Sequence, residues 1–177
     1  MSDPVQADGY TLRSIAVHWL TAIIVVALFI THEAARGSFG NIIHVSGGAV
    51  VGVFLLWRVW HRAIRGLPLR PHQPFIIDVT SLIVLWGFLA TIVVVVITGY
   101  FLPWSLGRQF DLFGLIYIPT PMAANPVVHE FIEEVHDIAG HIFVPLLGLH
   151  LLGVAKHAFI DKDGIARRMF KPAKAGR

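Results

Sequence analysis

Ten histidines occur in a chain whose 177 residues are 55% hydrophobic and only 14% charged. Three of them, His136, His141 and His150, fall within one apolar stretch, residues 135–150. An imidazole is costly inside a membrane-length apolar helix, so such residues face a bundle interior, where they relay protons, form hydrogen bonds or bind a ligand. Histidine nitrogen is also a common axial ligand of haem iron. The histidines therefore raise the question of a cofactor site and of the helices that position it.

The spacing of two of these histidines predicts a shared helix face. His136 and His150 are fourteen residues apart. Fourteen residues are close to four turns of α-helix and rise about 21 Å, most of the thickness of a bilayer. The two rings are therefore expected on one face of one helix, near opposite sides of the membrane.

Other helices offer a histidine at each of these depths. His18 lies near the start of the first apolar segment and is expected at the level of His150, while His44 starts the second segment at the level of His136. Two bis-histidine pairs result, an outer pair of His44 with His136 and an inner pair of His18 with His150. Each pair is expected to provide the axial ligands of one haem, with iron as the bound metal. A zinc site would require three or four ligands at one depth, which the pairs do not supply.

Two more histidines bear on the assignment. His32 follows His18 by fourteen residues, so it also faces the outer site and competes with His44. His141 is five residues from His136, about 140° around the helix, and is expected to face elsewhere.

The remaining histidines are expected near the membrane surfaces. His157, near the inner surface, is within reach of a haem propionate. His61, His72 and His129 are expected at membrane edges or in loops, exposed to solvent.

Four apolar segments are long enough to cross a membrane, since about 20 residues span the hydrocarbon core. They cover residues 12–31, 42–64, 75–102 and 131–159, and a basic tail follows at 160–177. A spanning segment must satisfy its backbone hydrogen bonds internally, which favours helices over open strands. The expected fold is an all-α membrane protein, a four-helix transmembrane bundle with two b haems that forms a single domain over residues 1–177. With no cysteine, iron–sulfur clusters are excluded.

The basic residues indicate the orientation of the bundle. Of the 14 Lys and Arg, all but Arg36 and Arg108 lie at the start of the first segment, around the loop between the second and third, or from the end of the fourth segment into the tail. The positive-inside rule then places both termini in the cytoplasm of a multi-pass inner-membrane protein. The isoelectric point near 9.6 reflects this topology, and no nucleic-acid partner is expected.

Arg58 is a candidate partner for the inner haem. It follows His44 by fourteen residues, on the same helix face and at the depth of the inner pair. Its guanidinium there would neutralise a propionate; the alternative is an ordinary positive-inside anchor. Gly47, Gly48 and Gly52 either leave room for a macrocycle or serve tight helix packing.

The chain resembles the bacterial cytochrome b561 family from residue 12 to residue 170. The matching stretches are "RSIAVHWL", "NIIHVSGGAVVGVFLLWRVWHR", "FGLIYIP", "VHDIAGHIFVPLLGLHLLGVAKHAF" and "KDGIARRMF". The resemblance implies two haem b groups on the four paired histidines and electron exchange with ubiquinone. Some members are similar to superoxide oxidases, which pass an electron from superoxide to quinone, and related cytochrome b subunits serve larger dehydrogenases or hydrogenases. A haem-free membrane subunit is the alternative of a different class.

The outer loops suggest what approaches the outer site. Residues 103–130 form a long connection rich in aromatics and proline, expected to lie along the interface as a lid. The outer residues are acidic on balance: Glu33, Asp111, Glu130, Glu133 and Glu134 oppose the two outer arginines. Such a surface attracts a cationic protein more than a small anion. The expected periplasmic donor is a basic redox protein, or quinone entering from the lipid, with superoxide less favoured.

Overall fold

The computed structural model describes residues 10–65 and 74–172. Some residues used in the charge and histidine predictions lie outside the described residues: Arg70, His72, Lys174, Arg177 and the side chain of Arg65.

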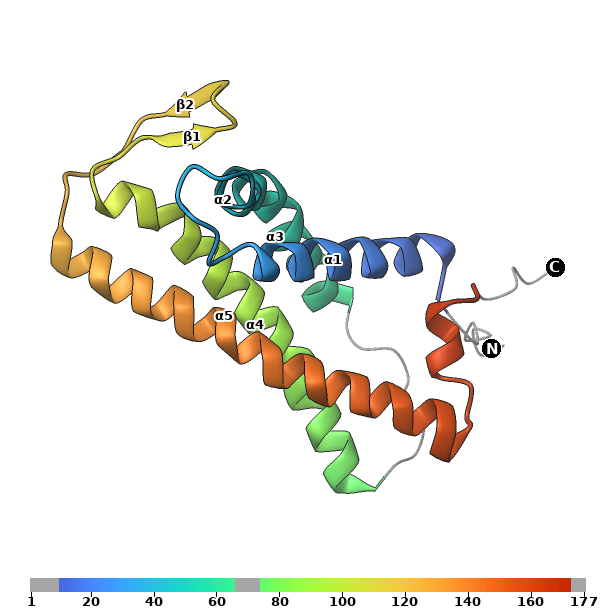
Figure 1. Cartoon of the computed structure of the whole chain (residues 1–177). Coiled ribbons are helices and arrows are strands. Elements are labelled where there is room, and N and C mark those ends of the chain that lie inside the picture. The colour runs from blue at the N-terminus through green and yellow to red at the C-terminus, as the bar shows by residue number, and fades with distance from the viewer. Residues whose placement is uncertain (1–9, 66–73, 173–177) are drawn as a thin grey trace.

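Long helices make up most of the chain (Figure 1). They are α1 (Leu12–Ile30), α3 (Gly48–Arg65), α4 (Phe75–Ser105) and α5 (Pro126–Ala155). The short α2 (Phe39–Ile42) and the π-helix η1 (Ile43–Gly47) lead into α3. A second π-helix, η2 (Lys156–Asp161), continues α5, and the 3-10 helix η3 (Ala166–Met169) follows.

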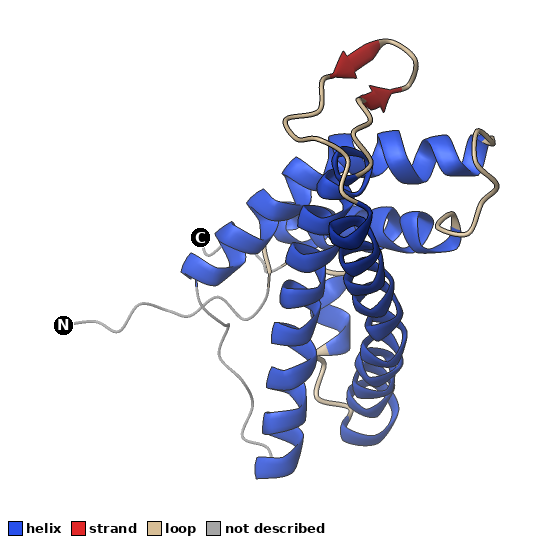
Figure 2. Ribbon diagram, turned by 90° about the vertical axis from the view of Figure 1, so that its left-hand side faces the viewer, coloured by secondary structure: helices blue, strands red, loops and turns tan. Residues whose placement is uncertain are grey.

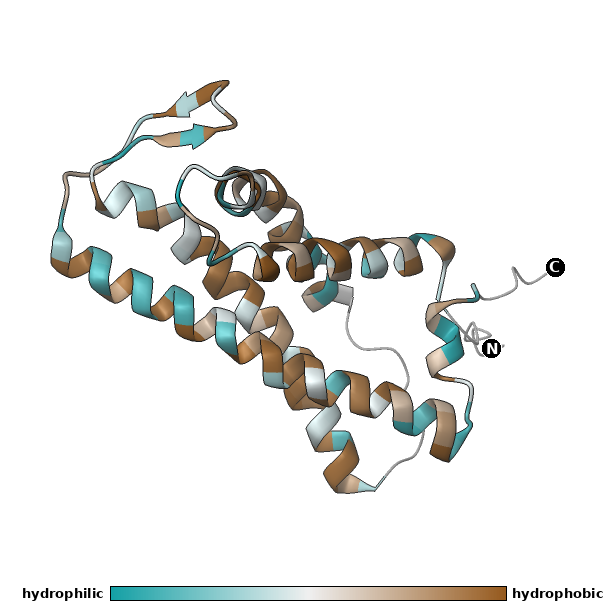
Figure 3. Cartoon of the chain, in the orientation of Figure 1, coloured by the Kyte–Doolittle hydropathy of each residue, from teal (hydrophilic) through white to brown (hydrophobic). Residues whose placement is uncertain are grey.

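Four of the described helical stretches are long and apolar enough to cross a membrane. They are Leu12–Ile30, Phe39–Ile64, Phe75–Ser105 and Pro126–Asp161. Apolar residues cover most of α1, α3 and α4, whereas polar residues gather on the first half of α5 (Figure 3). Helices that are apolar all round are typical of membrane spans. The predicted membrane bundle of helices is confirmed.

Capping residues explain where the first and last long helices begin. The Thr11 side chain accepts a hydrogen bond from the Ser14 N–H at 3.2 Å. The Asn125 side chain accepts one from the Val128 N–H at 3.1 Å, and Pro126 occupies the first turn. Both caps satisfy backbone donors that a helix start leaves free. α5 therefore starts five residues before the position expected from hydropathy.

Close contact between helices depends on two glycines. A Cβ at Gly52 would lie 3.0 Å from Val96 Cγ1, and one at Gly87 would lie 2.9 Å from Leu146 Cδ2. Small residues of this kind let membrane helices approach closely. Gly52 thus serves the close packing of α3 against α4. The interpretation that Gly52 leaves room for a macrocycle is wrong.

A small hairpin stands at one end of the bundle (Figure 2). Strands β1 (Phe110–Leu112) and β2 (Ile116–Ile118) pair antiparallel, with Phe110 opposite Ile118. The buried Ser46 hydroxyl in η1 donates to the Asp111 carbonyl at 2.9 Å and accepts from the Phe113 N–H at 3.2 Å. The long connection between α4 and α5 is therefore fastened to the start of the second span. We call this end of the molecule the hairpin end.

The opposite end brings the start of α1 together with the segment that follows α5. The Trp19 indole N–H donates to the Met169 carbonyl at 2.9 Å, and the Trp19 ring lies 5.3 Å from the ring of Phe170. We call this the terminal end.

Candidate functional site

Two histidine pairs lie at different levels of the bundle. At the hairpin end, the ring centres of His44 in η1 and His136 in α5 are 6.2 Å apart, with the planes at 87°. At the terminal end, those of His18 in α1 and His150 in α5 are 6.3 Å apart, at 52°. The structure brings the four histidines together in the two pairs that their spacing suggested.

The two separations fit a metal ion between the rings. Two imidazoles that bind one ion from opposite sides, each at about 2 Å from nitrogen to metal, have ring centres roughly 6 Å apart. At this separation the rings of a pair are not stacked on each other. Both pairs can therefore hold a haem iron in the axial positions.

Hydrogen bonds orient both rings of the hairpin-end pair. Nδ1–H of His44 donates to the Leu28 carbonyl at 2.8 Å. Nδ1–H of His136 donates to the Thr98 hydroxyl oxygen at 2.8 Å, and that hydroxyl in turn donates to the Val94 carbonyl at 2.6 Å. An Nδ1 held in this way leaves Nε2 as the nitrogen that binds a metal, and it fixes the orientation of the ring.

The terminal-end pair is held differently. Over the described part of the chain, neither His18 nor His150 has a hydrogen-bond partner. His18 instead contacts the Trp19 ring at 5.7 Å, and His150 contacts the Phe88 ring at 5.9 Å, both edge to face.

Arg58 is the basic residue whose charge reaches the terminal-end pair. It is half-buried in α3, and its charge acts on His18. Within residues 10–65 and 74–172, no carboxylate pairs with this guanidinium. A partly buried guanidinium without an acidic partner fits a site that binds a carboxylate ligand.

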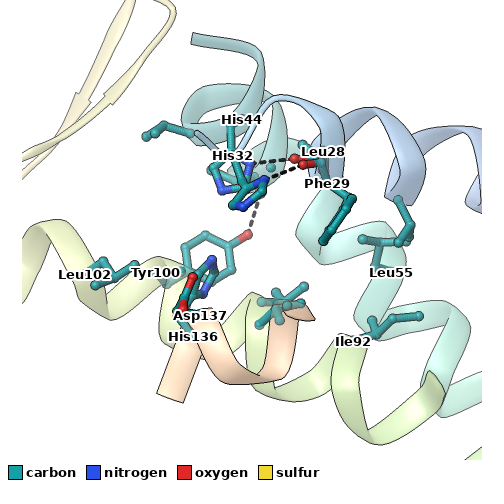
Figure 4. A pocket seen from close by; sticks show the side chains of 18 of the residues that line it. Leu28, Phe29, His32, His44, Leu55, Ile92, Tyr100, Leu102, His136 and Asp137 are labelled. Atoms are coloured by element: carbon teal, nitrogen blue, oxygen red, sulfur yellow. Dashed lines mark hydrogen bonds between the residues drawn. The ribbon is translucent and has the colours of Figure 1, made fainter. Parts of the chain in front are cut away.

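A cavity of about 200 Å³ surrounds the hairpin-end pair. Its walls come from α1, the η1–α3 segment, α4 and α5, with the buried Phe110 of the hairpin as one more wall residue. His32 and His44 face His136 across it (Figure 4). The Tyr100 hydroxyl donates to the Ala49 carbonyl and ties α4 to α3 beside the cavity. Most of the lining is apolar, as a haem face requires.

Glycines leave room in this cavity. A Cβ at Gly140, one turn after His136, would meet no heavy atom within 4 Å, and the nearest atom to one at Gly48 is Leu28 Cδ2 at 3.7 Å. Both glycines line the cavity. By contrast, a Cβ at Gly99 would lie 3.3 Å from Cε1 of His136, so this glycine permits the close approach of the histidine ring. Gly48 was expected either to leave room for a macrocycle or to serve tight helix packing. The structure agrees with the first interpretation, because Gly48 lines the cavity.

His32 and His141 also line the cavity. The expectation that His141 faces elsewhere is wrong, because the cavity extends between α1 and α5 and reaches a second face of α5. The His141 ring lies 5.6 Å from the ring of His32, whereas His44 is the histidine that opposes His136. The geometry therefore favours His44 over His32 as the ligand.

The remaining described histidines serve local structure. Nδ1 of His129 lies 2.8 Å from the Ser105 hydroxyl oxygen, so the expectation of a solvated loop histidine is wrong: it joins α5 to the end of α4. The His61 ring lies 5.3 Å from the Trp57 ring on α3.

His157 lies in a compact polar group beyond the end of α5. Its Nδ1 lies 2.7 Å from Asp163 Oδ2 and 3.2 Å from Asp161 Oδ2. Lys156 pairs with Asp161 as well. These groups satisfy one another, so they stabilise the turn toward η3.

A bundle of membrane-spanning helices with imidazole pairs in its interior is the arrangement of a membrane cytochrome b. The chain belongs to the prokaryotic cytochrome b561 family, which it matches over residues 9–172. It is 30% identical over 175 residues to cytochrome b561 homolog 2 of Escherichia coli strain K12, covering 92% of this chain and 91% of that protein. It is 24% identical over 180 residues to the probable superoxide oxidase CybB of Yersinia pestis, covering 94% and 98%. The chain is thus a multi-pass bacterial membrane cytochrome that binds haem b and transfers electrons.

Proposed function

We propose that this cytochrome holds two haem b groups and carries electrons between a donor at the hairpin end and ubiquinone in the membrane. The observation that carries the proposal is the repeated geometry of the two histidine pairs, with ring centres 6.2 and 6.3 Å apart. One pair alone would suffice for a single haem, whereas two pairs fourteen residues apart along α5 would provide a route across the bilayer.

The side chains of the chain have distinct roles in this proposal. His44 with His136, and His18 with His150, hold the iron of one haem each. When bound, each haem supplies a centre that accepts and releases one electron. The Leu28 carbonyl and the Thr98 hydroxyl keep the hairpin-end imidazoles in the metal-binding tautomer. Arg58 would stabilise a propionate at the terminal end, and the apolar walls of the hairpin-end cavity would exclude water from the haem there.

The charge distribution supports an orientation with the terminal end in the cytoplasm. Arg58 and Arg62 lie toward the end of α3, and Arg167 and Arg168 lie in η3, whereas Arg36 is placed near the hairpin end. Basic residues concentrate on the cytoplasmic side of membrane proteins. The hairpin end then faces the periplasm of a bacterial inner membrane.

The donor is proposed to be a basic redox protein. Exposed acidic side chains follow the first turns of α5 toward His136: Glu130, Glu133, Glu134 and Asp137. Glu33 is exposed near the end of α1. Opposite charges speed encounter between redox partners.

A second candidate is oxidation of superoxide with ubiquinone as acceptor. The Yersinia pestis relative, named a probable superoxide oxidase, favours it, and the acidic hairpin end opposes it because superoxide is an anion.

Purified protein provides the test. We expect a reduced-minus-oxidised b-type spectrum, two haems per chain, and reoxidation of the reduced haems by a soluble ubiquinone analogue. Reduction by a basic donor protein is expected to slow as salt is added. Reduction by superoxide close to the diffusion limit would favour the second candidate, and reduced haems that quinone does not reoxidise would contradict both.

A further inference from the structure

The hairpin-end cavity contains a polar atom that neither axial ligand accounts for. His32 follows α1, and its Nδ1–H donates to the Phe29 carbonyl at 2.5 Å. Its Nε2 is buried and has no hydrogen-bond partner within the described part of the chain. Buried polar atoms in folded proteins almost always have a partner, so this nitrogen points to a group that occupies the cavity.

A second imidazole lies beside it from another helix. The His141 ring on α5 meets the His32 ring edge-on, with centres 5.6 Å apart at 79°. Nδ1–H of His141 donates to the Asp137 carbonyl at 2.9 Å, and Phe29 stacks against His32 at 5.1 Å. The backbone bonds and the ring contacts together fix both imidazoles at one edge of the cavity.

The charges around this edge limit what can bind there. No Lys or Arg side chain is among the cavity residues of the described chain. Glu33 Oε1 is 3.8 Å from His32 Nε2, beyond hydrogen-bond distance, and Asp137 is beside His141. A haem brings two propionate groups, and at the terminal end Arg58 is available for one of them. At the hairpin end, where the described lining supplies no cation, the imidazole edge offers nitrogen atoms to a carboxyl group.

We propose that His32, supported by His141, hydrogen-bonds a propionate of the haem held by His44 and His136. The inference rests on the proposed dihaem function. The Nδ1–H is already donated to the Phe29 carbonyl, so Nε2 of the neutral ring carries no proton. The hydrogen bond therefore uses one proton taken up from water together with the haem, which is shared between His32 Nε2 and the propionate oxygen. This reduces the negative charge near the iron and favours the reduced haem, so His32 is a positioning residue that raises the potential of one haem.

A redox titration of the purified holoprotein tests this. The His32→Phe variant, which keeps a ring but lacks the nitrogen, is expected to bind both haems and to lower the midpoint potential of the hairpin-end haem alone. In His32→Gln, the amide N–H reaches a similar position, so the midpoint potential of the hairpin-end haem is expected to return most of the way to the wild-type value. His61→Phe, which removes a histidine elsewhere, leaves the hairpin-end potential unchanged. The Arg58→Gln variant identifies the terminal-end haem, because it is expected to shift the midpoint potential of that haem only.

Two results would overturn the inference. One is a His32→Phe protein with both haems present and both potentials unchanged. The other is loss of the hairpin-end haem from both His32 variants, which would make His32 an axial ligand. A wild-type protein that binds a single haem would instead contradict the proposed dihaem function, and haem stoichiometry separates that outcome from the other two.

Discussion

The two histidine pairs have the same separation and different support. At the hairpin end, both rings donate a hydrogen bond through Nδ1, to Leu28 and to Thr98. At the terminal end, aromatic rings contact the histidines, which have no hydrogen-bond partner among the described residues, and the charge of Arg58 acts on His18. The first arrangement fixes ring orientation without a bound haem, whereas under the proposed function the second would adjust the charge around one.

The backbone differs between the two sites as well. His44 lies in the π-helix η1, whereas His18 lies in the regular α1. Single π-turns inside helices occur frequently at functional sites. Ser46 in the same π-turn holds the hairpin, so the fastening of the hairpin and the placement of His44 share one local structure. One helix, α5, thus presents two histidines fourteen residues apart to two different environments.

Removal of an axial ligand should have the largest effect. We expect His44→Ala or His136→Ala to lose the hairpin-end haem and keep the other, and His18→Ala or His150→Ala to do the reverse. Haem content per chain and the reduced spectrum measure this. The pairing would be wrong if His32→Ala removed the hairpin-end haem while His44→Ala did not.

Filling the cavity should come next. Gly140→Leu places a side chain in space that is open in the structure. We expect loss of the hairpin-end haem with the terminal-end haem retained, and an intermediate effect for Gly140→Ala. Normal content of both haems in Gly140→Leu would show that the macrocycle does not use this space.

The Thr98→Val variant tests the orienting hydrogen bond with little change of shape. Loss of such a partner typically weakens metal binding about 10- to 100-fold. We expect faster transfer of the hairpin-end haem to an acceptor protein, measured by absorbance, with the terminal-end haem unaffected. Equal rates in wild type and variant would mean that packing alone orients His136.

Arg58→Gln should have a smaller effect, on the other site. Removing a cation near a propionate favours the oxidised haem, so the midpoint potential of the terminal-end haem is expected to fall. A redox titration measures it, with Arg62→Gln as the control. An unchanged potential would assign Arg58 to anchoring at the membrane surface.

The smallest expected effect concerns the turn after η2. Desolvation acts to raise the pKa of Asp163, but hydrogen bonds from the Ile165 N–H and the His157 ring outweigh it and hold this pKa below its ordinary value. The charged carboxylate therefore stabilises the turn above the ordinary pKa, and this contribution is lost as the pH falls through the lowered value.

Asp163→Asn should reproduce that loss at neutral pH. Trypsin cleavage after Arg167 or Arg168 is expected to be modestly faster than in wild type, with Glu134→Gln as the control. Equal cleavage rates would show that the contact of Trp19 with Met169 holds the segment by itself.

Long-range order in this fold was predictable because it is periodic. The four apolar segments and the fourteen-residue spacing of His136 and His150 sufficed to anticipate the membrane helices and the face on which the rings lie. The pairing across helices followed from depth alone, since every spanning helix crosses between the same two membrane surfaces.

Local contacts were less predictable. Three-residue strands in the connection between α4 and α5 are too short for an alternating pattern, and their stability depends on Ser46, more than sixty residues earlier. His141 was expected to face away from the site because it lies about 140° around the helix from His136. That angle does not show how wide the cavity is, and the cavity extends far enough around α5 to include His141. The sequence around Gly52 is equally compatible with room for a macrocycle and with tight helix packing, and only the contact with Val96 in the structure decides between them.

The haem-to-protein ratio of the purified wild-type chain tests the central claim most directly. A pyridine haemochrome assay with quantitative amino-acid analysis gives this ratio. The structure predicts two haem b per chain, falling to one in His136→Ala and in His150→Ala. A ratio of one in the wild-type protein, unchanged by one of these two substitutions, would contradict the account.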